Sequence, residues 1–183
     1  MRIISGQARG RTILTPPGNA TRPTLDRVRE NLFNMLQGRV AGARVLDLFA
    51  GSGALSLEAI SRGAAQAVLA DRDRKACAVQ HRNISALSFE EQTRVLCCDW
   101  RRATELLTKE EARFDLVFLD PPYAMADEEL QAVFDSLRAI VFPGTTAVLE
   151  HAARRCFQPA GWTLAKQRAW GYCGVSLFLP PDD

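Results

Sequence analysis

From residue 44 onward the chain alternates between two patterns of apolar and polar positions. Short β-rich apolar runs, typical of buried strands, are separated by longer segments in which apolar residues recur every three or four positions, as in amphipathic helices. The expected strands are Arg44 to Phe49, Ala67 to Asp71, Arg94 to Cys98, Phe114 to Leu119 and Thr145 to Glu150. The expected helices are Ala54 to Arg62, Arg74 to Leu87, Ala103 to Glu111 and Glu128 to Ile140. This order predicts an α/β fold in which crossover helices cover a parallel sheet.

Both ends of the chain depart from this alternation. Two β-rich runs, Trp162 to Arg168 and Val175 to Leu179, lie so close together that a terminal antiparallel hairpin is predicted. Before the first strand, Thr24 is expected to cap a helix. Its buried stripe would be Leu25, Val28, Leu32, Met35 and Leu36. We therefore expect residues 1–40 to form an extension that packs on a core of residues 41–183, as one folded unit.

The expected N-terminal extension is basic. Residues 1–40 contain seven arginines and two acidic residues, a net charge of +5, whereas the rest of the chain carries −3. This asymmetry favours a nucleic-acid partner at the basic end, although a solvated arginine-rich surface would give the same pattern. The arginines expected to contact phosphates are Arg2, Arg9, Arg11, Arg22, Arg27 and Arg29.

Cysteine and histidine spacing argues against a metal site. The five cysteines include no C-x-x-C pair and the two histidines have no metal-ligand spacing, so the cysteines are expected to be reduced core thiols. The N-terminus lacks the apolar run of a signal peptide or a membrane span. These features predict a cytoplasmic protein with neither a metal nor a membrane partner.

A glycine-rich loop follows the first expected strand, with the sequence Asp47-Leu48-Phe49-Ala50-Gly51-Ser52-Gly53. Glycines at the point where a strand gives way to a helix let the backbone approach a ligand that a Cβ would exclude. In open α/β sheets, ligands bind beyond the carboxyl ends of the strands, where this loop is expected. A dinucleotide site is the rival interpretation, but its fingerprint requires Gly or Ala where Ser56 stands.

Acidic residues occur at the ends of three successive expected strands, at Asp47, Asp71 and Asp99. Asp71 stands at the separation from the loop at which an acid can accept from ribose hydroxyls, and Asp99 could accept from an adenine amino group. A ligand with a ribose, an adenine and a cationic centre, but no pyrophosphate, fits this set. S-adenosyl-L-methionine has these parts. The expected cofactor-binding residues are Asp47, Phe49, Ala50, Gly51, Ser52, Gly53, Asp71, Arg72, Asp99 and Trp100.

The tetrapeptide Asp120-Pro121-Pro122-Tyr123 follows the fourth expected strand, and its four residues are the predicted catalytic residues. Adjacent prolines stiffen the backbone and donate no N–H, so the carbonyls of the turn stay available as acceptors. The Asp120 carboxylate and the Pro121 carbonyl could accept the two N–H groups of an exocyclic amine and direct its lone pair at a methyl group. Tyr123 could stack on a flipped base. A rigid Pro-Pro turn without a chemical role is the alternative.

Four blocks of the sequence carry a family resemblance. They are residues 1–6 with Arg9-Gly10-Arg11, residues 22–33, Asp47 to Gly53, and Asp120 to Tyr123. Together they resemble the RsmD family of bacterial 16S ribosomal RNA guanine-N2 methyltransferases. The first two blocks are specific to that family, whereas many amino methyltransferases share the other two. Asp71 departs from the Glu that relatives often carry, which requires a closer approach to the ribose or a bridging water.

The resemblance implies a class I S-adenosylmethionine-dependent methyltransferase fold, which is Rossmann-like and has a seven-stranded sheet with the last strand antiparallel. It implies methylation of the N2 amino group of guanine 966 in 16S rRNA, within the assembling small ribosomal subunit.

Three other functions are compatible with parts of the sequence. A DNA adenine-N6 methyltransferase would use the same acceptors, but no segment resembles a target-recognition domain. A protein-glutamine methyltransferase usually carries Asn where Asp120 stands. A non-catalytic RNA-binding assembly factor would be expected to have lost the glycine loop or the tetrapeptide, and both are present.

Overall fold

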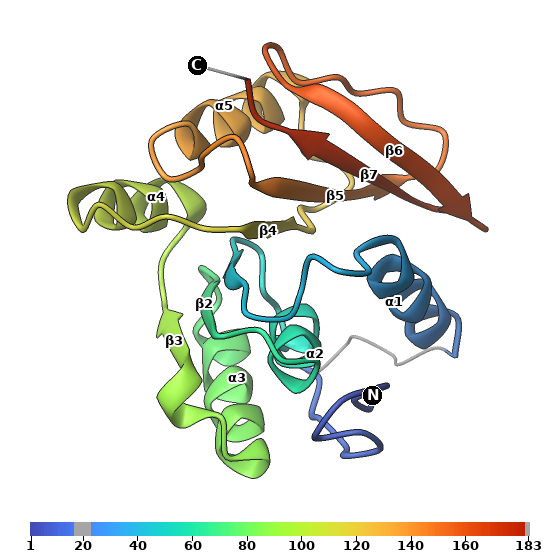
Figure 1. Ribbon diagram of the computed structural model, residues 1–183, viewed down its shortest axis with the longest axis vertical. Coiled ribbons are helices and arrows are strands. Elements are labelled where there is room, and N and C mark those ends of the chain that lie inside the picture. Colours follow the sequence, from blue (N-terminus) through green and yellow to red (C-terminus); the bar gives the residue numbers. More distant parts are fainter. Residues whose placement is uncertain (17–22, 182–183) are drawn as a thin grey trace.

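The fold is built on one mixed seven-stranded sheet. The computed structural model describes residues 1–16 and 23–181, and the side chains of residues 1–16 and 26–181. The strand order is β3-β2-β1-β4-β5-β7-β6 (Figure 1). The strands are β1 Arg44–Asp47, β2 Gln66–Ala70, β3 Thr93–Leu96, β4 Leu116–Leu119, β5 Thr146–Ala152, β6 Thr163–Trp170 and β7 Cys173–Leu179. The first five strands pair in parallel, and β7 runs antiparallel to both β5 and β6. The antiparallel last strand and the terminal hairpin are therefore confirmed.

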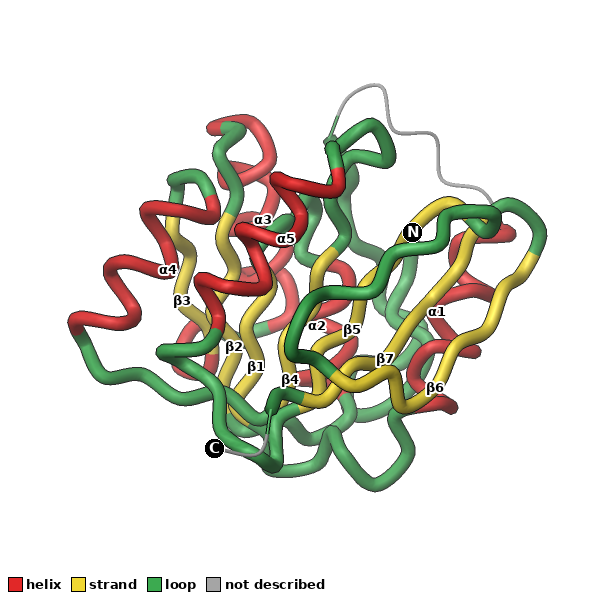
Figure 2. The backbone as a smooth tube through the Cα atoms, turned by 90° about the horizontal axis from the view of Figure 1, so that it is seen from above, coloured by secondary structure: helices red, strands yellow, loops and turns green. Residues whose placement is uncertain are grey.

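Helices cover both faces of this sheet (Figure 2). They are α1 Pro23–Met35, α2 Ala54–Ser61, α3 Arg74–Leu87, α4 Trp100–Lys109 and α5 Asp127–Leu137, with a short 3-10 helix at Glu90–Gln92. Apolar residues of α1, α2 and α3 pack with Val45 and Phe118 on one face, here called the α1 face. Apolar residues of α4 and α5 pack with Leu46 and Leu119 on the other. Side chains of alternating strand residues therefore enter two separate cores, as expected for a sheet buried on both sides.

Three helices begin at other residues than predicted, and for α5 the difference is one residue, Asp127 instead of Glu128. Helix α4 begins at Trp100 instead of Ala103, because the Asp99 carboxylate accepts from the backbone N–H of Arg102 at 2.9 Å and caps the helix earlier. Helix α1 begins at Pro23, which places Thr24 inside the helix and not at its cap. In the predicted stripe of α1, Val28, Leu32 and Leu36 are buried, Met35 is half-buried, and the side chain of Leu25 lies outside the described residues.

An N-terminal strap, defined as residues 1–14, folds back on itself and lies along α2. Arg2 and Thr12 form an antiparallel bridge, and the side chains of Ile3 and Ile13 are buried in the core of the α1 face. Gly6 has φ +82°, and a Cβ there would lie 1.7 Å from the Ser61 carbonyl oxygen at the end of α2. Only glycine allows that approach of the two backbones.

Three further expectations concern the cysteines, a metal site and membrane-spanning helices. All five cysteines are free, but only Cys77 and Cys173 are buried; Cys97 and Cys156 are exposed, so the expectation of core thiols is wrong for these two. Among the residues that the structure describes, no three His, Cys, Asp or Glu side chains are grouped so as to hold a metal ion. No helix in the described part of the chain combines the length and the apolar character that crossing a membrane would require.

Candidate active site

A cleft of about 420 Å³ opens at the carboxyl ends of β1 to β4. Seven of the predicted site residues line it: Phe49, Asp71, Arg72, Asp99, Trp100, Asp120 and Pro122. The cleft therefore joins the predicted cofactor residues to the predicted catalytic turn. Five further lining residues were not predicted as site residues: Leu48, Arg101, Ala124, Met125 and Glu129. No feature of the sequence marks these five as ligand contacts, and only the folded chain brings them to the cleft.

Asp71, at the end of β2, fastens the glycine loop. Its Oδ2 accepts from the backbone N–H of Gly51 at 2.8 Å and its Oδ1 accepts from that of Asp73 at 2.9 Å. Each carboxylate oxygen can accept a second hydrogen bond, so ribose hydroxyls remain possible donors. Gly51 has φ +53°, and the space where its Cβ would stand is open. The loop thus leaves room for a ligand beside Asp71.

Gly53 and Asp47 both have contacts inside the fold. A Cβ on Gly53 would lie 2.8 Å from Cδ2 of Leu69, and its φ is +82°, so close packing against β2 also requires a glycine here. Asp47 is 1% exposed and does not line the cleft; Ser56 donates to its Oδ2 at 3.1 Å. Burial, reinforced by the charge of Asp71, raises the pKa of Asp47 to about 7. Ala50 and Ser52, which belong to the loop itself, are likewise buried.

The end of the cleft beyond β3 combines a carboxylate with an aromatic platform. Asp99 is exposed and uses Oδ1 for the cap of α4, which leaves Oδ2 available to a ligand. Trp100 is 6% exposed, and the guanidinium of Arg101 lies 4.2 Å from its ring centroid. An acceptor beside an apolar wall suits the amino group and the flat face of an adenine.

Of the Asp120 to Tyr123 turn, Asp120 and Pro122 line the cleft, whereas Pro121 and Tyr123 do not. Pro121 is buried, whereas the Tyr123 side chain is 42% exposed. Arg155 donates to the carbonyls of Tyr123 at 3.4 Å and Met125 at 2.6 Å and pairs with Asp127 at 2.5 Å. Arg155, which is not part of the tetrapeptide, therefore holds the turn in place. No local pattern in the sequence predicts this role.

A second carboxylate, Glu150 of β5, stands beside this turn. Its Oε1 accepts from the Tyr123 hydroxyl at 3.4 Å and from the Cys173 thiol at 3.2 Å. Desolvation by the surrounding protein raises the pKa of Asp120, which nevertheless reaches solvent, and the negative charges of Glu150 and Asp47 raise it further. Desolvation raises the pKa of Glu150 as well, and raises that of Cys173 to about 12. Glu150 was not among the predicted site residues, although it ends an expected strand as the predicted acids do.

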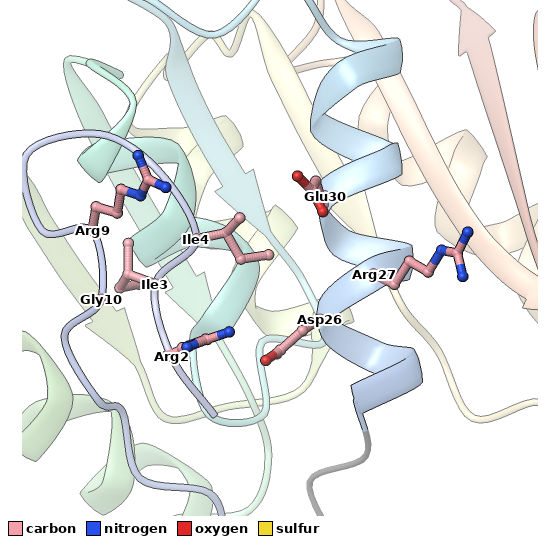
Figure 3. Close-up of a pocket in the computed structure, with 8 residues that line it drawn as sticks. All are labelled: Arg2, Ile3, Ile4, Arg9, Gly10, Asp26, Arg27 and Glu30. Carbon is pink, nitrogen blue, oxygen red and sulfur yellow. The ribbon is translucent and has the colours of Figure 1, made fainter.

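The predicted RNA-contacting arginines fall into three groups. Arg2, Arg9 and Arg27 line a pocket of about 510 Å³ between the strap and α1, in which Arg2 points toward Asp26 and Arg27 points away (Figure 3). Arg11 is exposed and donates to the Ala86 carbonyl. Arg22 lies outside the described residues.

For Arg29 the prediction of an RNA contact is wrong. Its side chain is 5% exposed, and its guanidinium donates to Asp26 and to the Arg2 carbonyl. Burial lowers its pKa, while Glu58 and Asp26 oppose that shift. A guanidinium enclosed in this way serves the fold and not an RNA phosphate.

The sheet order and the strand-end cleft define a class I S-adenosylmethionine-dependent methyltransferase. A family model described as Conserved hypothetical protein 95 matches residues 1–179. Ribosomal RNA small subunit methyltransferase D of Escherichia coli K12 is 34% identical over 97% of this chain and 89% of its own length. The chain belongs to this family, the RsmD family.

Solved structures agree with the assignment. The structure of yhhF from Escherichia coli has a TM-score of 0.83 and 34% identity, and the match covers 100% of this chain and 99% of that one. A hypothetical protein of Thermus thermophilus has a TM-score of 0.82 and 31% identity, with coverage of 97% and 98%. The likeness therefore extends over the whole chain, including the strap.

Proposed function

We propose that this protein transfers a methyl group from S-adenosyl-L-methionine to the N2 amino group of guanine 966 in 16S rRNA, in the cytoplasm, on the assembling small ribosomal subunit. The observation that carries the proposal is that Asp120 lines the same cleft as Asp71 and Asp99. The RNA class follows from the relative in Escherichia coli, whose name states its substrate. The nucleotide follows from the RsmD resemblance.

The residues of the cleft fit the cofactor. Asp71 and Asp99 would hold the ribose and the adenine amino group, and the open face of Gly51 leaves space for the methionine end. The acidic side chains lining the cleft, Asp71, Asp99, Asp120 and Glu129, favour a cationic ligand. When bound, the cofactor supplies an electrophilic methyl group.

The chain contributes orientation, acceptors and a route for one proton. Ionised Asp120 and the Pro121 carbonyl accept the two N–H groups of the target amine, so that its lone pair faces the methyl group. Tyr123, with its ring 42% exposed, stacks on the flipped base. Asp120 accepts the proton that the nitrogen loses once its new bond forms. Positioning of this kind lowers barriers by up to roughly 7 to 11 kcal/mol.

Methyl transfer onto isolated ribosomal particles tests the function. Small subunits from a strain lacking the enzyme are incubated with the protein and tritiated cofactor, and the labelled nucleotide is mapped. Label at guanine 966, abolished by Asp120→Ala while cofactor affinity is retained, is the expected result. In a parallel incubation with DNA, label on an adenine would support the rival methyltransferase. Cofactor binding without label on either nucleic acid would support the assembly factor.

A further inference from the structure

Glu150 lies beside the catalytic carboxylate on the neighbouring strand. Leu119 of β4 and Leu149 of β5 are register partners in parallel strands, and the next residues along each strand are Asp120 and Glu150. Side chains alternate between the faces of a sheet, so the Glu150 carboxylate, inside β5, points to the side opposite Leu149. Leu149 belongs to the core under α4 and α5, so Glu150 points to the α1 face, as its partner Cys173 does. Asp120 directly follows β4, and the charge of Glu150 reaches it there.

The contacts of Glu150 fix one carboxylate oxygen and leave the other available. The Tyr123 hydroxyl and the Cys173 thiol both donate to Oε1, at 3.4 Å and 3.2 Å. Within the described residues no hydrogen bond reaches Oε2, and Oε2 is not among the enclosed atoms that lack a partner. A carboxylate that is held to Tyr123 by one oxygen and has its other oxygen available is placed to accept from a base stacked on Tyr123.

The electrostatics of the pair favour a ligand rich in donors. The negative charge of Glu150 raises the pKa of Asp120, so the two carboxylates destabilise each other in the free protein. A ligand edge with N–H groups facing both of them would relieve this repulsion. Guanine offers such an edge, because its N1–H stands next to its N2 amino group, whereas adenine presents N1 as an acceptor beside its amino group.

We propose that Glu150 is a specificity-determining residue whose Oε2 accepts the N1–H of the target guanine, while Asp120 and Pro121 hold the N2 amine. This inference rests on the proposed function and explains how the site distinguishes guanine from adenine. An adenine would place its N1 lone pair against the carboxylate. Sites built to pair with a substrate N–H strongly reject analogues that lack it, because a buried acceptor is then left without a partner.

The base 2-aminopurine separates base reading from chemistry, because it keeps the 2-amino group of guanine but has an acceptor at N1. Small subunits are reconstituted with ligated 16S rRNA that carries guanine or 2-aminopurine at the target position. Wild-type protein, Glu150→Gln and Glu128→Gln are assayed on both, and Glu128, exposed on α5, provides the matched control. Thermal melting and cofactor titration verify that each variant is folded.

We expect wild-type protein to methylate the 2-aminopurine particle at least tenfold more slowly than the guanine particle, measured as kcat/KM. Glu150→Gln, whose amide can donate to an N1 acceptor, should lower the ratio of guanine to 2-aminopurine rates by at least tenfold, and Glu128→Gln should leave it unchanged. Equal use of both particles by the wild type, or equal slowing of both by Glu150→Gln, would overturn the inference. Inactivity of wild-type protein on the guanine particle would instead overturn the proposed function.

Discussion

The buried carboxylate of Glu58 holds the start of the chain against α2. Glu58 is fully buried, accepts from the backbone N–H groups of Ile4 at 2.8 Å and Ser5 at 3.0 Å, and pairs with Arg62 at 2.7 Å. The buried Arg29 lies 3.8 Å away. One side chain thus satisfies backbone donors of the strap and compensates a buried cation.

Glu58→Ala should lower the free energy of unfolding by about 3 to 5 kcal/mol, because among the described residues it leaves the buried guanidinium of Arg29 with Asp26 as its one acidic partner. Urea denaturation followed by circular dichroism measures the change. Glu128→Ala on the exposed side of α5 should stay within about 0.5 kcal/mol of wild type. Equal effects of the two substitutions would show that Glu58 is not a structural anchor.

The pH dependence of turnover should report the ionisation of Asp120. Desolvation, Glu150 and Asp47 all raise its pKa, and the amine acceptor must be ionised, so activity is present at high pH and is lost as pH falls through that raised pKa. Plotted against pH, kcat/KM should have its acid limb well above the ordinary range of an aspartate. Glu150→Gln, which removes a negative neighbour, should move that limb to lower pH. A limb that did not move would mean that another group titrates.

Individual residues show which parts of the candidate site could be predicted from the sequence and which could not. Asp71, Asp99 and Asp120 were predicted because each follows an apolar strand, and strand ends of a parallel sheet meet at one edge. Arg29 was misassigned because charge counting does not distinguish a buried guanidinium from an exposed one. Glu150 follows the same strand-end rule as the acids, but its partner Cys173 comes from a distant strand that pairs only in the folded sheet.

At the scale of elements, the order and type of the strands and helices from residue 44 onward were predictable, and their ends were less so. Strand β1 ends at Asp47 and not at Phe49, since the chain turns into the glycine loop there. The two-residue periodicity continues past that point, whereas the strand ladder ends soon after it, with one further backbone hydrogen bond from the Leu48 N–H to the Phe118 carbonyl at 3.2 Å. The early start of α4 depends on a cap by Asp99, a residue that was assigned only to the cofactor.

The double role of Asp99 can be separated by substitution. Asp99→Ala should lose about 1 kcal/mol of stability with the cap and also more than tenfold in cofactor affinity. Asp99→Ser retains a capping oxygen but has no second acceptor for the adenine, so stability should recover while affinity stays low. Thermal melting and calorimetric titration give the two values. If Asp99→Ser restored both, the carboxylate would have no part in binding the cofactor.

At the scale of the whole molecule, the strap and the cofactor loop are attached to opposite ends of α2. Gly53 stands at the start of this helix, whereas the Gln7 backbone N–H donates to the Ser61 carbonyl at its end. Arg9 therefore lies away from the cleft, and we expect the strap to contact RNA that flanks the target and not the target base.

Replacing both Arg9 and Arg11 with alanine should flatten the slope of log RNA affinity against log salt by roughly one unit, since each phosphate contact on irregular RNA contributes about 0.7. Cofactor affinity should not change. The control pair is Lys109 and Arg113, of which Arg113 is exposed and, like Arg11, donates to a backbone carbonyl. Filter binding at several salt concentrations gives the slopes. If both double variants had the same slope, Arg9 and Arg11 would be ordinary surface charges and not RNA contacts.

The position of β7 between β5 and β6 has a consequence for synthesis of the chain. Ribosomes produce the strands in sequence order, so the cofactor-side residues up to Asp99 and the Asp120 turn emerge while the edge of β5 is still unpaired. Glu150 acquires Cys173 only when the final strand arrives. A nascent chain arrested before β7 would therefore expose a bare apolar strand edge, and translation arrest in this interval should favour aggregation.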